Sequence, residues 1–281
     1  MVFAFNPQAD TAQDKLSKTA TVPPRVSEKQ PMHYHLANLQ GIGRRSSQED
    51  AFAFGNALDA EAIAERGLLI VAADGMGGLA DGKAASETVT STLLAQFQRF
   101  DMTEPLAPQL LDAVSDANDR VWDKLGGRGG STVVAGLIYD EKLYFTSVGD
   151  SYLFLLHDRE LIRLNRSQNV LSRDRMDAIL VGELDPYTPL ENRERDAITH
   201  FLGMGELEET DSLRRPLLLT PGDVLLFCSD GVGGVLESAC IEDCLSCATP
   251  EEMCAALEGE IQKRNLKYQD NYTALIVQCR N

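Results

Sequence analysis

The chain has 281 residues, of which 43% are apolar and 25% are charged. That composition is typical of a globular protein, and it excludes collagen-like, disulfide-scaffold and wholly disordered chains. There are 43 Asp and Glu residues against 26 Lys and Arg, a net charge of −17. Nucleic acids and anionic membrane surfaces bind basic faces, so we expect neither as a partner.

The N-terminus shows no signal peptide, because it lacks a basic start and a sustained apolar core. No apolar run approaches the length of a membrane-spanning helix. The six cysteines fit a reducing compartment. The sequence therefore predicts a cytoplasmic protein.

Two regions differ in composition. Residues 1–31 are polar, contain the pair Pro23-Pro24 and show no period, which predicts a flexible tail. Residues 32–281 are expected to form one domain, with a flap-like insertion around residues 165–216, where the sequence is polar and only weakly periodic.

The first half of that domain predicts a strand, a glycine turn and two helices. A weakly alternating strand covers 35–40, and an apolar strand over 68–73 runs into the turn at 74–78. A helix follows, with apolar residues every four positions from Ala85 to Phe97. A second helix begins after Pro108 and ends at two glycines.

The middle of the chain predicts an antiparallel meander, because its connections are too short for parallel crossovers. The expected strands cover 132–139, 143–148, 152–157 and 161–164. After the insertion we expect a hairpin of 217–220 and 224–228 around the turn 221–223. Two helices follow, the second opened by a capping box at Thr249, and a last strand covers 272–279.

This order favours an α+β fold in which two antiparallel sheets are flanked by helix pairs. A doubly wound parallel sheet would need persistent strand–helix alternation, which the chain lacks.

Three cysteines, Cys240, Cys244 and Cys247, have a spacing that can ligate an iron–sulfur cluster. Ile241, Cys244 and Leu245 also form the apolar stripe of a helix, where a free cysteine packs as a small hydrophobe. We favour the packing interpretation.

Acidic residues recur at the ends of the expected strands. Asp74 and Asp230 each follow an apolar strand, Asp270 precedes the last strand, and Glu49 and Asp50 stand next to each other. One such aspartate is usually a cap. Several in one chain, each beside Gly or Asn, indicate a cation site, and carboxylates with water are the ligands that Mg²⁺ and Mn²⁺ prefer.

Other hydrolase signatures are missing from the sequence. None of the four histidines forms H-E-x-x-H, and there is no G-x-S-x-G motif. The glycines of residues 75–78 lack the lysine of a P-loop.

Six short motifs follow one another between residues 34 and 279: 43–50 (GRRSSQED), 71–78 (VAADGMGG), 130–134 (GSTVV), 147–151 (SVGDS), 227–232 (FCSDGV) and 269–273 (QDNYT). In this order they resemble the metal-dependent serine/threonine protein phosphatases, the protein phosphatase 2C or PPM family, in bacterial form. The resemblance implies a four-layer α-β-β-α sandwich, which agrees with the expected element order.

The resemblance also implies a site with two Mn²⁺ or Mg²⁺ ions. Asp74 would bridge both ions and the Gly75 carbonyl would bind one of them. Asp230 and Asp270 would hold the other. In this chemistry a water or hydroxide that bridges the ions attacks the phosphorus.

The remaining residues of the implied site lie in the first motif. Glu49 and Asp50 would accept hydrogen bonds from metal-bound waters. Arg45 would bind the substrate phosphate, because guanidinium offers a planar fork to two phosphate oxygens. Since neighbouring side chains of a strand point to opposite faces, we expect only one of Arg44 and Arg45 to face the metals. The spacing to Asp50 in the family motif selects Arg45.

Four positions depart from the family pattern. Met76 stands where many eukaryotic members carry a histidine that is proposed as a general acid. Gly127 replaces an aspartate, which speaks against a third ion. Tyr152 replaces an arginine, and residues 165–169 replace the segment that opens the flap.

The sequence therefore predicts a cytoplasmic protein phosphatase that acts on phosphoserine and phosphothreonine. Its partners would be phosphorylated proteins and a Ser/Thr kinase. The alternatives are a catalytically inactive binding module of the same fold and a small-molecule phosphatase.

Overall fold

The structure is a computed structural model that describes residues 32–78, 81–182 and 193–281. The tail expected over 1–31 lies outside these residues and stays a prediction.

The described strands form two larger sheets and one short ribbon, and all pairings within them are antiparallel. The first sheet has the order β1 (His33–Gly41), β13 (Tyr272–Arg280), β12 (Val224–Cys228), β8 (Tyr152–His157) and β9 (Glu160–Arg163). The second has the order β10 (Asp211–Ser212), β7 (Lys142–Val148), β6 (Val133–Tyr139), β3 (Leu68–Ala73) and β2 (Ala51–Gly55). β11 (Leu217–Leu218) also pairs with β7, and β4 (Gly75–Met76) pairs with β5 (Gly130–Ser131).

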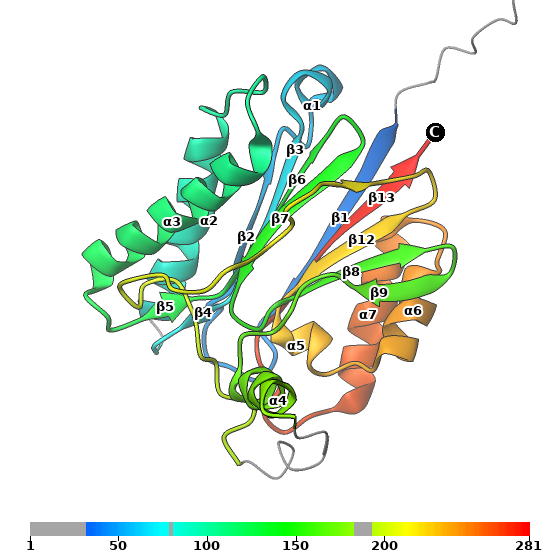
Figure 1. The fold of residues 1–281 in the computed structure, drawn as a ribbon. Coiled ribbons are helices and arrows are strands. Elements are labelled where there is room, and N and C mark those ends of the chain that lie inside the picture. The colour runs from blue at the N-terminus through cyan, green and yellow to red at the C-terminus, as the bar shows by residue number, and fades with distance from the viewer. Residues whose placement is uncertain (1–31, 79–80, 183–192) are drawn as a thin grey trace, which may run out of the picture. The chain divides into compact units, whose positions relative to one another are not determined.

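The helices of the described residues are α1 (Ala60–Arg66), α2 (Asp81–Phe97), α3 (Leu106–Leu125), α4 (Val170–Leu180), α5 (Asp230–Gly233), α6 (Ser238–Leu245) and α7 (Pro250–Arg264). In Figure 1, α2 and α3 cover the outer face of the second sheet, and α6 and α7 cover that of the first. The four-layer α-β-β-α sandwich predicted from the sequence is confirmed.

The central strands are apolar on both faces because both faces are covered. In β3, Leu69 and Val71 contact α2 and α3, while Leu68 and Ile70 face the other sheet. β12 alternates in the same way between the helix side and the sheet–sheet interface. This explains why both strands are continuous apolar runs. They are the rigid elements whose ends carry Asp74 and Asp230.

The expected helix boundaries are largely confirmed. Gly126 ends α3 in the left-handed conformation. Thr249 and Glu252 form the predicted capping box of α7, with reciprocal bonds of 3.3 and 3.2 Å. The stripe of Ile241, Cys244 and Leu245 is buried in α6, so the packing interpretation of these cysteines is confirmed.

The hairpin expected around 221–223 is wrong. β11 pairs with β7 in the second sheet, whereas β12 pairs with β8 and β13 in the first. The turn therefore carries the chain from one sheet to the other. Asp223 fixes this turn, since its Oδ2 accepts the Thr220 amide at 2.8 Å.

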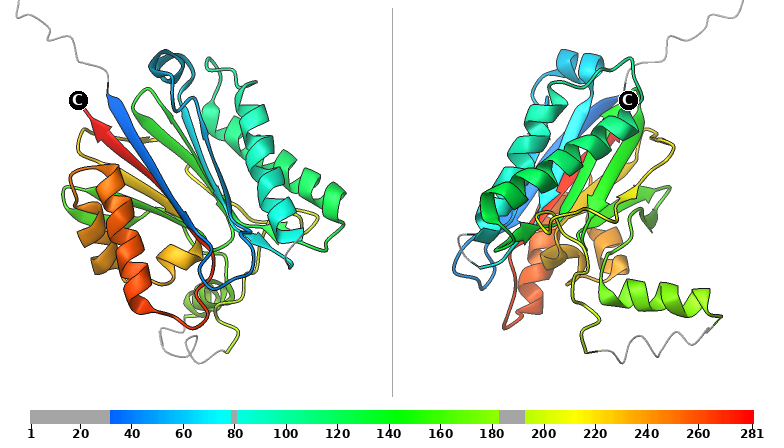
Figure 2. Two further views of the ribbon diagram at one scale, coloured as in Figure 1. Left: turned by 180° about the vertical axis from the view of Figure 1, so that it is seen from behind. Right: turned by 60° about the vertical axis from the view of Figure 1, so that its left-hand side comes forward.

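The elements that were not predicted are β2, α1, the single-turn helix α5 and the two-residue strands β4, β5 and β10. Helix α4, in the expected insertion, stands away from the sandwich (Figure 2, right). Within the described ranges, no helix is long and apolar enough to cross a membrane.

Candidate metal and phosphate site

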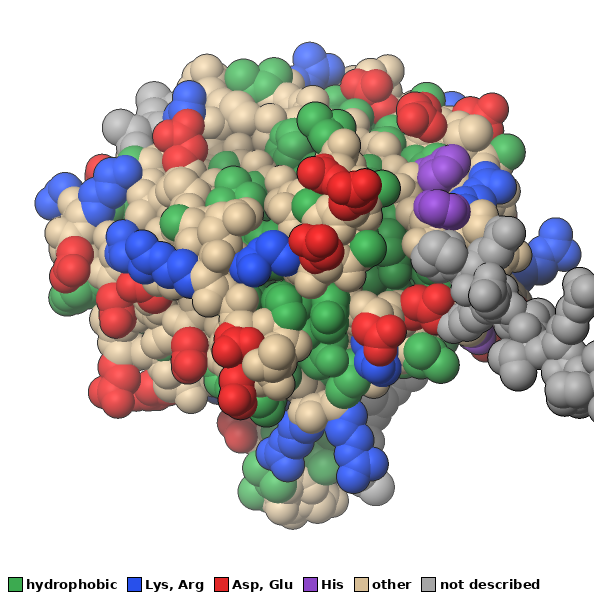
Figure 3. All heavy atoms as spheres, turned by 90° about the horizontal axis from the view of Figure 1, so that it is seen from above, with side chains coloured by type: hydrophobic (Ala, Val, Ile, Leu, Met, Phe, Trp, Pro, Cys, Tyr) green, Lys and Arg blue, Asp and Glu red, His purple; other side chains and the backbone are tan. Residues whose placement is uncertain are grey.

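Five aspartates gather at one end of the sandwich, and strand register explains why. Asp50 and Asp74 are neighbours because Ala51 pairs with Ala73 across β2 and β3. In the other sheet, Cys228 pairs with both Tyr152 and Ala274. The adjoining Asp150, Asp230 and Asp270 therefore meet at the same edge. The opposite end, seen in Figure 3, carries acidic and basic side chains scattered over its surface.

Crowding and burial make Asp50, Asp74, Asp150 and Asp230 hard to ionise. Burial and then the charges of Asp50, Asp230, Asp150 and Asp270 raise the pKa of Asp74 well above its ordinary value. Burial also raises the pKa of Asp50 to about 6 and that of Asp150 to about 7. For Asp230, burial and then the charge of Asp270 raise the pKa. Without cations, ionising these four side chains costs free energy, because they are buried and their negative charges repel one another.

Side chains at the ends of β12 and β13, in the first sheet, hold Asp50 in place. Ser229 Oγ and Thr273 Oγ1 donate to Asp50 Oδ2 at 2.9 and 2.7 Å. The other oxygen, Asp50 Oδ1, is buried and has no hydrogen-bond partner in the part of the chain that the structure describes. One half of the carboxylate is fixed while the other is left open.

The same feature recurs in two more aspartates. Asp150 Oδ1 and Asp230 Oδ1 are buried without a partner among the described residues. Buried polar atoms normally find partners, and an unpartnered carboxylate oxygen is costly. Oxygen donors of this kind suit Mg²⁺ or Mn²⁺. The residues present therefore fit a divalent metal site.

The described side chains are not arranged as a complete metal-binding site. In the described part of the chain, no three Asp, Glu, His or Cys side chains already stand in a metal-binding arrangement. Asp270 is one reason. Its Oδ1 accepts the Asn271 amide at 2.7 Å and its Oδ2 pairs with Arg45 Nη2 at 2.5 Å. Both oxygens are engaged, so Asp270 must give up Arg45 or share that oxygen to bind an ion.

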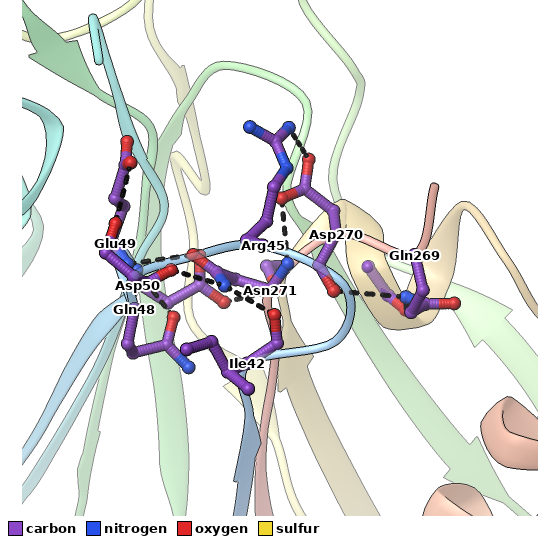
Figure 4. A network of polar contacts seen from close by, with 11 residues as sticks. Ile42, Arg45, Gln48, Glu49, Asp50, Gln269, Asp270 and Asn271 are labelled. Atoms are coloured by element: carbon purple, nitrogen blue, oxygen red, sulfur yellow. Dashed lines mark hydrogen bonds and ion pairs between the residues drawn. The ribbon is translucent and has the colours of Figure 1, made fainter. Parts of the chain in front are cut away.

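Arg44 and Arg45 lie in the loop between β1 and β2, not on a strand, so the argument from strand alternation is wrong. The two side chains still diverge. Arg44 donates to Asn265 at 3.1 Å, while Arg45 reaches Asp270 at the acidic end (Figure 4). Arg45 is exposed and lies beside a predicted metal ligand, a position compatible with binding phosphate.

The structure separates Glu49 from the aspartates. Its Oε1 accepts from Ser47 Oγ at 3.2 Å, and its Oε2 lies against Gly82 at the start of α2. Gly75 lies at the site, and a Cβ there would come within 2.6 Å of the Gly82 and Glu49 carbonyls. Only glycine fits that close approach.

Sequence analysis assigned no role to Asp150, Ser229 or Thr273. Asp150 repeats the signal that marked Asp74 and Asp230, an aspartate beside glycine at a strand end, and could have been found. Ser229 and Thr273 could not, because their contacts with Asp50 span 179 and 223 residues.

Tyr152, which stands where the family pattern has an arginine, contacts an arginine from the neighbouring strand β9. The Arg163 guanidinium lies 4.0 Å from the centre of the Tyr152 ring, a cation–π contact. The charge of Arg163 also acts on Asp150 and opposes the rise in its pKa. A positive charge thus reaches this side of the site from β9.

Comparisons with known proteins agree with this geometry. The sequence model of the protein phosphatase 2C family matches residues 34–174, about half of the chain. Asp230 and Asp270 lie beyond that match.

A serine/threonine phosphatase, stp, of Listeria welshimeri is 25% identical over 221 residues, 75% of this chain and 84% of that protein. The structure is similar to the PPM Ser-Thr phosphatase MsPP of Mycobacterium smegmatis in complex with cacodylate. The two are 26% identical with a TM-score of 0.69, over 86% of this chain and 97% of that one. The catalytic domain of the phosphatase PstP in complex with two manganese ions has the same fold. It is 22% identical with a TM-score of 0.71, over 89% of this chain and 100% of that one.

Proposed function

The chain belongs to the protein phosphatase 2C family, and from that premise we propose that it removes phosphate from phosphoserine and phosphothreonine in proteins, using Mn²⁺ or Mg²⁺. One observation carries the proposal. Among the described residues, three buried carboxylate oxygens of Asp50, Asp150 and Asp230 have no hydrogen-bond partner, and they lie at the end of the sandwich where an exposed arginine also lies. Such a site attracts cations, and cations together with arginine attract a phosphate group.

Asp74, Asp230 and Asp270 would hold two ions, with the Gly75 carbonyl as a further ligand. When bound, divalent ions activate the attacking water and neutralise charge on the phosphoryl oxygens. The pKa shifts support these ligands, because burial and mutual repulsion penalise the ionised forms of Asp74 and Asp230 until positive charge arrives.

Arg45 would bind and orient the substrate. Its guanidinium can pair with two phosphoryl oxygens at once, which fixes the orientation of the phosphate. Arg45 is exposed and its present partner is the single carboxylate oxygen Asp270 Oδ2, so its fork is available to a ligand that arrives from solvent.

Asp50 would orient water. Ser229 and Thr273 hold its Oδ2, which leaves Oδ1 to accept a hydrogen bond from the attacking water. As the water oxygen bonds to phosphorus, the bond from phosphorus to the Ser or Thr oxygen breaks. The products are inorganic phosphate and the free hydroxyl side chain. Glu49 is proposed to act at the edge of the site through water.

The cellular setting is also proposed. The six free cysteines fit a cytoplasmic location. A phosphatase for phosphoserine and phosphothreonine implies a kinase that makes its substrates, so we expect a Ser/Thr kinase as its partner in signalling.

The test is hydrolysis of a phosphothreonine peptide with Mn²⁺, with Mg²⁺ and with a chelator. We expect turnover only with metal. Peptide binding without turnover at any metal concentration would identify the inactive binding module instead. Hydrolysis of p-nitrophenyl phosphate without hydrolysis of any member of a phosphopeptide panel would identify a small-molecule phosphatase.

A further inference from the structure

The segment that carries Arg45 and leads into Asp50 has no secondary structure of its own. Residues 42–50 form a turn and a loop between β1 and β2. Its backbone makes two bonds of its own, from Arg44 N to the Gln269 carbonyl at 2.8 Å and from Arg45 N to the Ile42 carbonyl at 3.3 Å. The conformation of this loop must therefore be fixed by other parts of the fold.

Ser86 Oγ and Gln40 Nε2 donate to the carbonyls of Glu49 and Asp50, at the end of the loop. One buried side chain supplies three contacts along the rest of it. Asn271 Nδ2 donates to the carbonyls of Ile42 and Ser47, both at 3.0 Å. Asn271 Oδ1 accepts the amide of Glu49 at 2.8 Å. Figure 4 shows Asn271 in the middle of the loop, with these bonds reaching both of its ends. The amide closes the loop on either side of Arg45.

Asparagine is well suited to this position. The contacts need two donors and one acceptor at short reach, and asparagine offers them from one planar group. Aspartate has the same shape but no donor, and serine has only one. Asn271 is 4% exposed, so a lost bond would leave a buried carbonyl without a partner.

Asn271 is itself held firmly. Tyr272, the next residue, pairs with Gly41 in the ladder of β13 and β1. A Cβ on Gly231 would lie 1.9 Å from the Asn271 carbonyl, so α5 and the start of β13 are in close contact. Asp270, the proposed metal ligand, is the preceding residue. The dipeptide Asp270-Asn271 thus joins the proposed metal site to the phosphate-binding loop.

We propose that Asn271 is a positioning residue of the phosphatase site: its amide holds the 42–50 loop so that Arg45 and Asp50 face the acidic end. Asn271 acts through Arg45 and Asp50, not on the substrate. This inference rests on the proposed function for its catalytic consequence, but the tether itself is a structural claim that can be tested without activity.

The first measurement is hydrogen exchange of peptides that cover residues 42–50 in the full chain. Asn271→Ala should speed exchange there by more than about tenfold, since the loop loses the three bonds that Asn271 makes. The matched control is Asn56→Asp. Asn56 Nδ2 also donates to two carbonyls, those of Gly67 and Ala62 at 3.0 and 3.4 Å, but at the other end of β2. That variant should speed exchange only around residues 56–67.

The second measurement is a double-mutant cycle on kcat/KM for one phosphopeptide. Asn271→Ala should lower kcat/KM by roughly 10- to 100-fold, as for other residues that orient a binding group. If Asn271 works by placing Arg45, adding Arg45→Ala should then cost less than about threefold, because interacting residues are not additive. Asn56→Asp should change kcat/KM by less than about threefold. Asn271→Asp, which keeps the shape and the acceptor, serves if the alanine variant does not fold.

Two results would overturn the inference: unchanged exchange over 42–50 in the Asn271 variants, or a full and additive Arg45 effect in their background. Failure of the proposed function looks different. The wild-type chain would then hydrolyse no phosphopeptide with Mn²⁺, and exchange alone would decide whether Asn271 tethers the loop.

Discussion

Each end of strand β12 carries an aspartate with a buried carboxylate oxygen, and the two aspartates differ in how their oxygens are used. Asp223, just before the strand, is 2% exposed and has a partner at each oxygen. Oδ1 contacts His157 Nδ1 at 2.6 Å, and Oδ2 accepts the Thr220 amide at 2.8 Å. Asp230, just after the strand, keeps a buried Oδ1 without a partner and faces Asp270.

This difference separates a structural carboxylate from a functional one. A buried carboxylate with satisfied oxygens stabilises a turn, and adding a ligand gains nothing. A buried carboxylate with an open oxygen beside other carboxylates costs folding energy, which a bound cation returns. Both aspartates flank the same strand and each has a buried oxygen, so what distinguishes them is whether each oxygen has a hydrogen-bond partner.

The largest effect should come from Asp74, at the centre of the unsatisfied group. Asp74→Asn removes the charge that is proposed to bridge both ions. We expect kcat on a phosphopeptide to fall by more than about 100-fold at saturating Mn²⁺, since even residues that only support metal ligands cost 10- to 100-fold. Far-UV circular dichroism should be unchanged. Activity near the wild-type level would contradict the assignment of Asp74.

The next largest effect should come from one of two adjacent arginines, Arg45, and not from its neighbour Arg44. Arg45→Ala removes the cation beside Asp270 and should lower kcat/KM by roughly 10- to 100-fold, the value of a charged hydrogen bond of about 1.5–3 kcal/mol. The Michaelis constant should change more than kcat, because phosphate binding is lost in the ground state too. Arg44→Ala, which removes only a bond to Asn265, should change kcat/KM by less than about threefold. If Arg44→Ala proved the more harmful, the phosphate-binding role would move to Arg44.

The same substitution at the two ends of β12 should have opposite effects on the metal-free protein. Asp223→Asn breaks satisfied bonds and should destabilise the fold by about 1–3 kcal/mol. Asp230→Asn removes a repelling charge and should raise Tm, by roughly 2–4 °C for about 1 kcal/mol. Thermal unfolding in a chelator measures both. A loss of stability in Asp230→Asn would show that its open oxygen carries no cost.

The smallest effect concerns the partner of Asp223. The hydrogen bond to Asp223, and then its charge, raise the pKa of His157 above the ordinary 6.5. Protonated His157 therefore favours the folded state. Its contribution is fully present below about pH 6.5 and is lost as the pH rises through the raised pKa. The Tm difference between wild type and His157→Gln should be larger at about pH 5.5 than at about pH 8.5. An equal difference at both pH values would contradict the ion pair.

The sequence predicted elements whose signals are local. The apolar run 68–73, the four-residue period of α2 and the capping box at Thr249 each reflect interactions within a few residues. β2, a five-residue strand at the edge of its sheet, and α1, which has no buried residue to give it an apolar stripe, were not predicted. It misplaced 217–228, because a turn that joins two strands of a hairpin has the same composition as one that joins two sheets.

The candidate site also has a part that local sequence signals predict and a part that they do not. Asp74, Asp230 and Asp270 were found because each stands at a strand end beside Gly or Asn, although the roles given to them came from the family resemblance and stay proposals. The support around them depends on contacts between distant segments. Asn271 meets Ser47 across 224 residues, and the pairing of Arg45 with Asp270 places the proposed phosphate-binding group on a proposed metal ligand. Neither contact has a signal in the local sequence.

The central claim is that the unsatisfied carboxylates hold divalent cations, and the rise of Tm with Mn²⁺ tests it most directly. At a Mn²⁺ concentration 100 times Kd, binding to the folded state stabilises it by about 2.7 kcal/mol. We predict that rise in the wild type and in Asp223→Asn, and a much smaller one in Asp230→Asn. An equal rise in Asp230→Asn, or no rise in the wild type, would contradict the account.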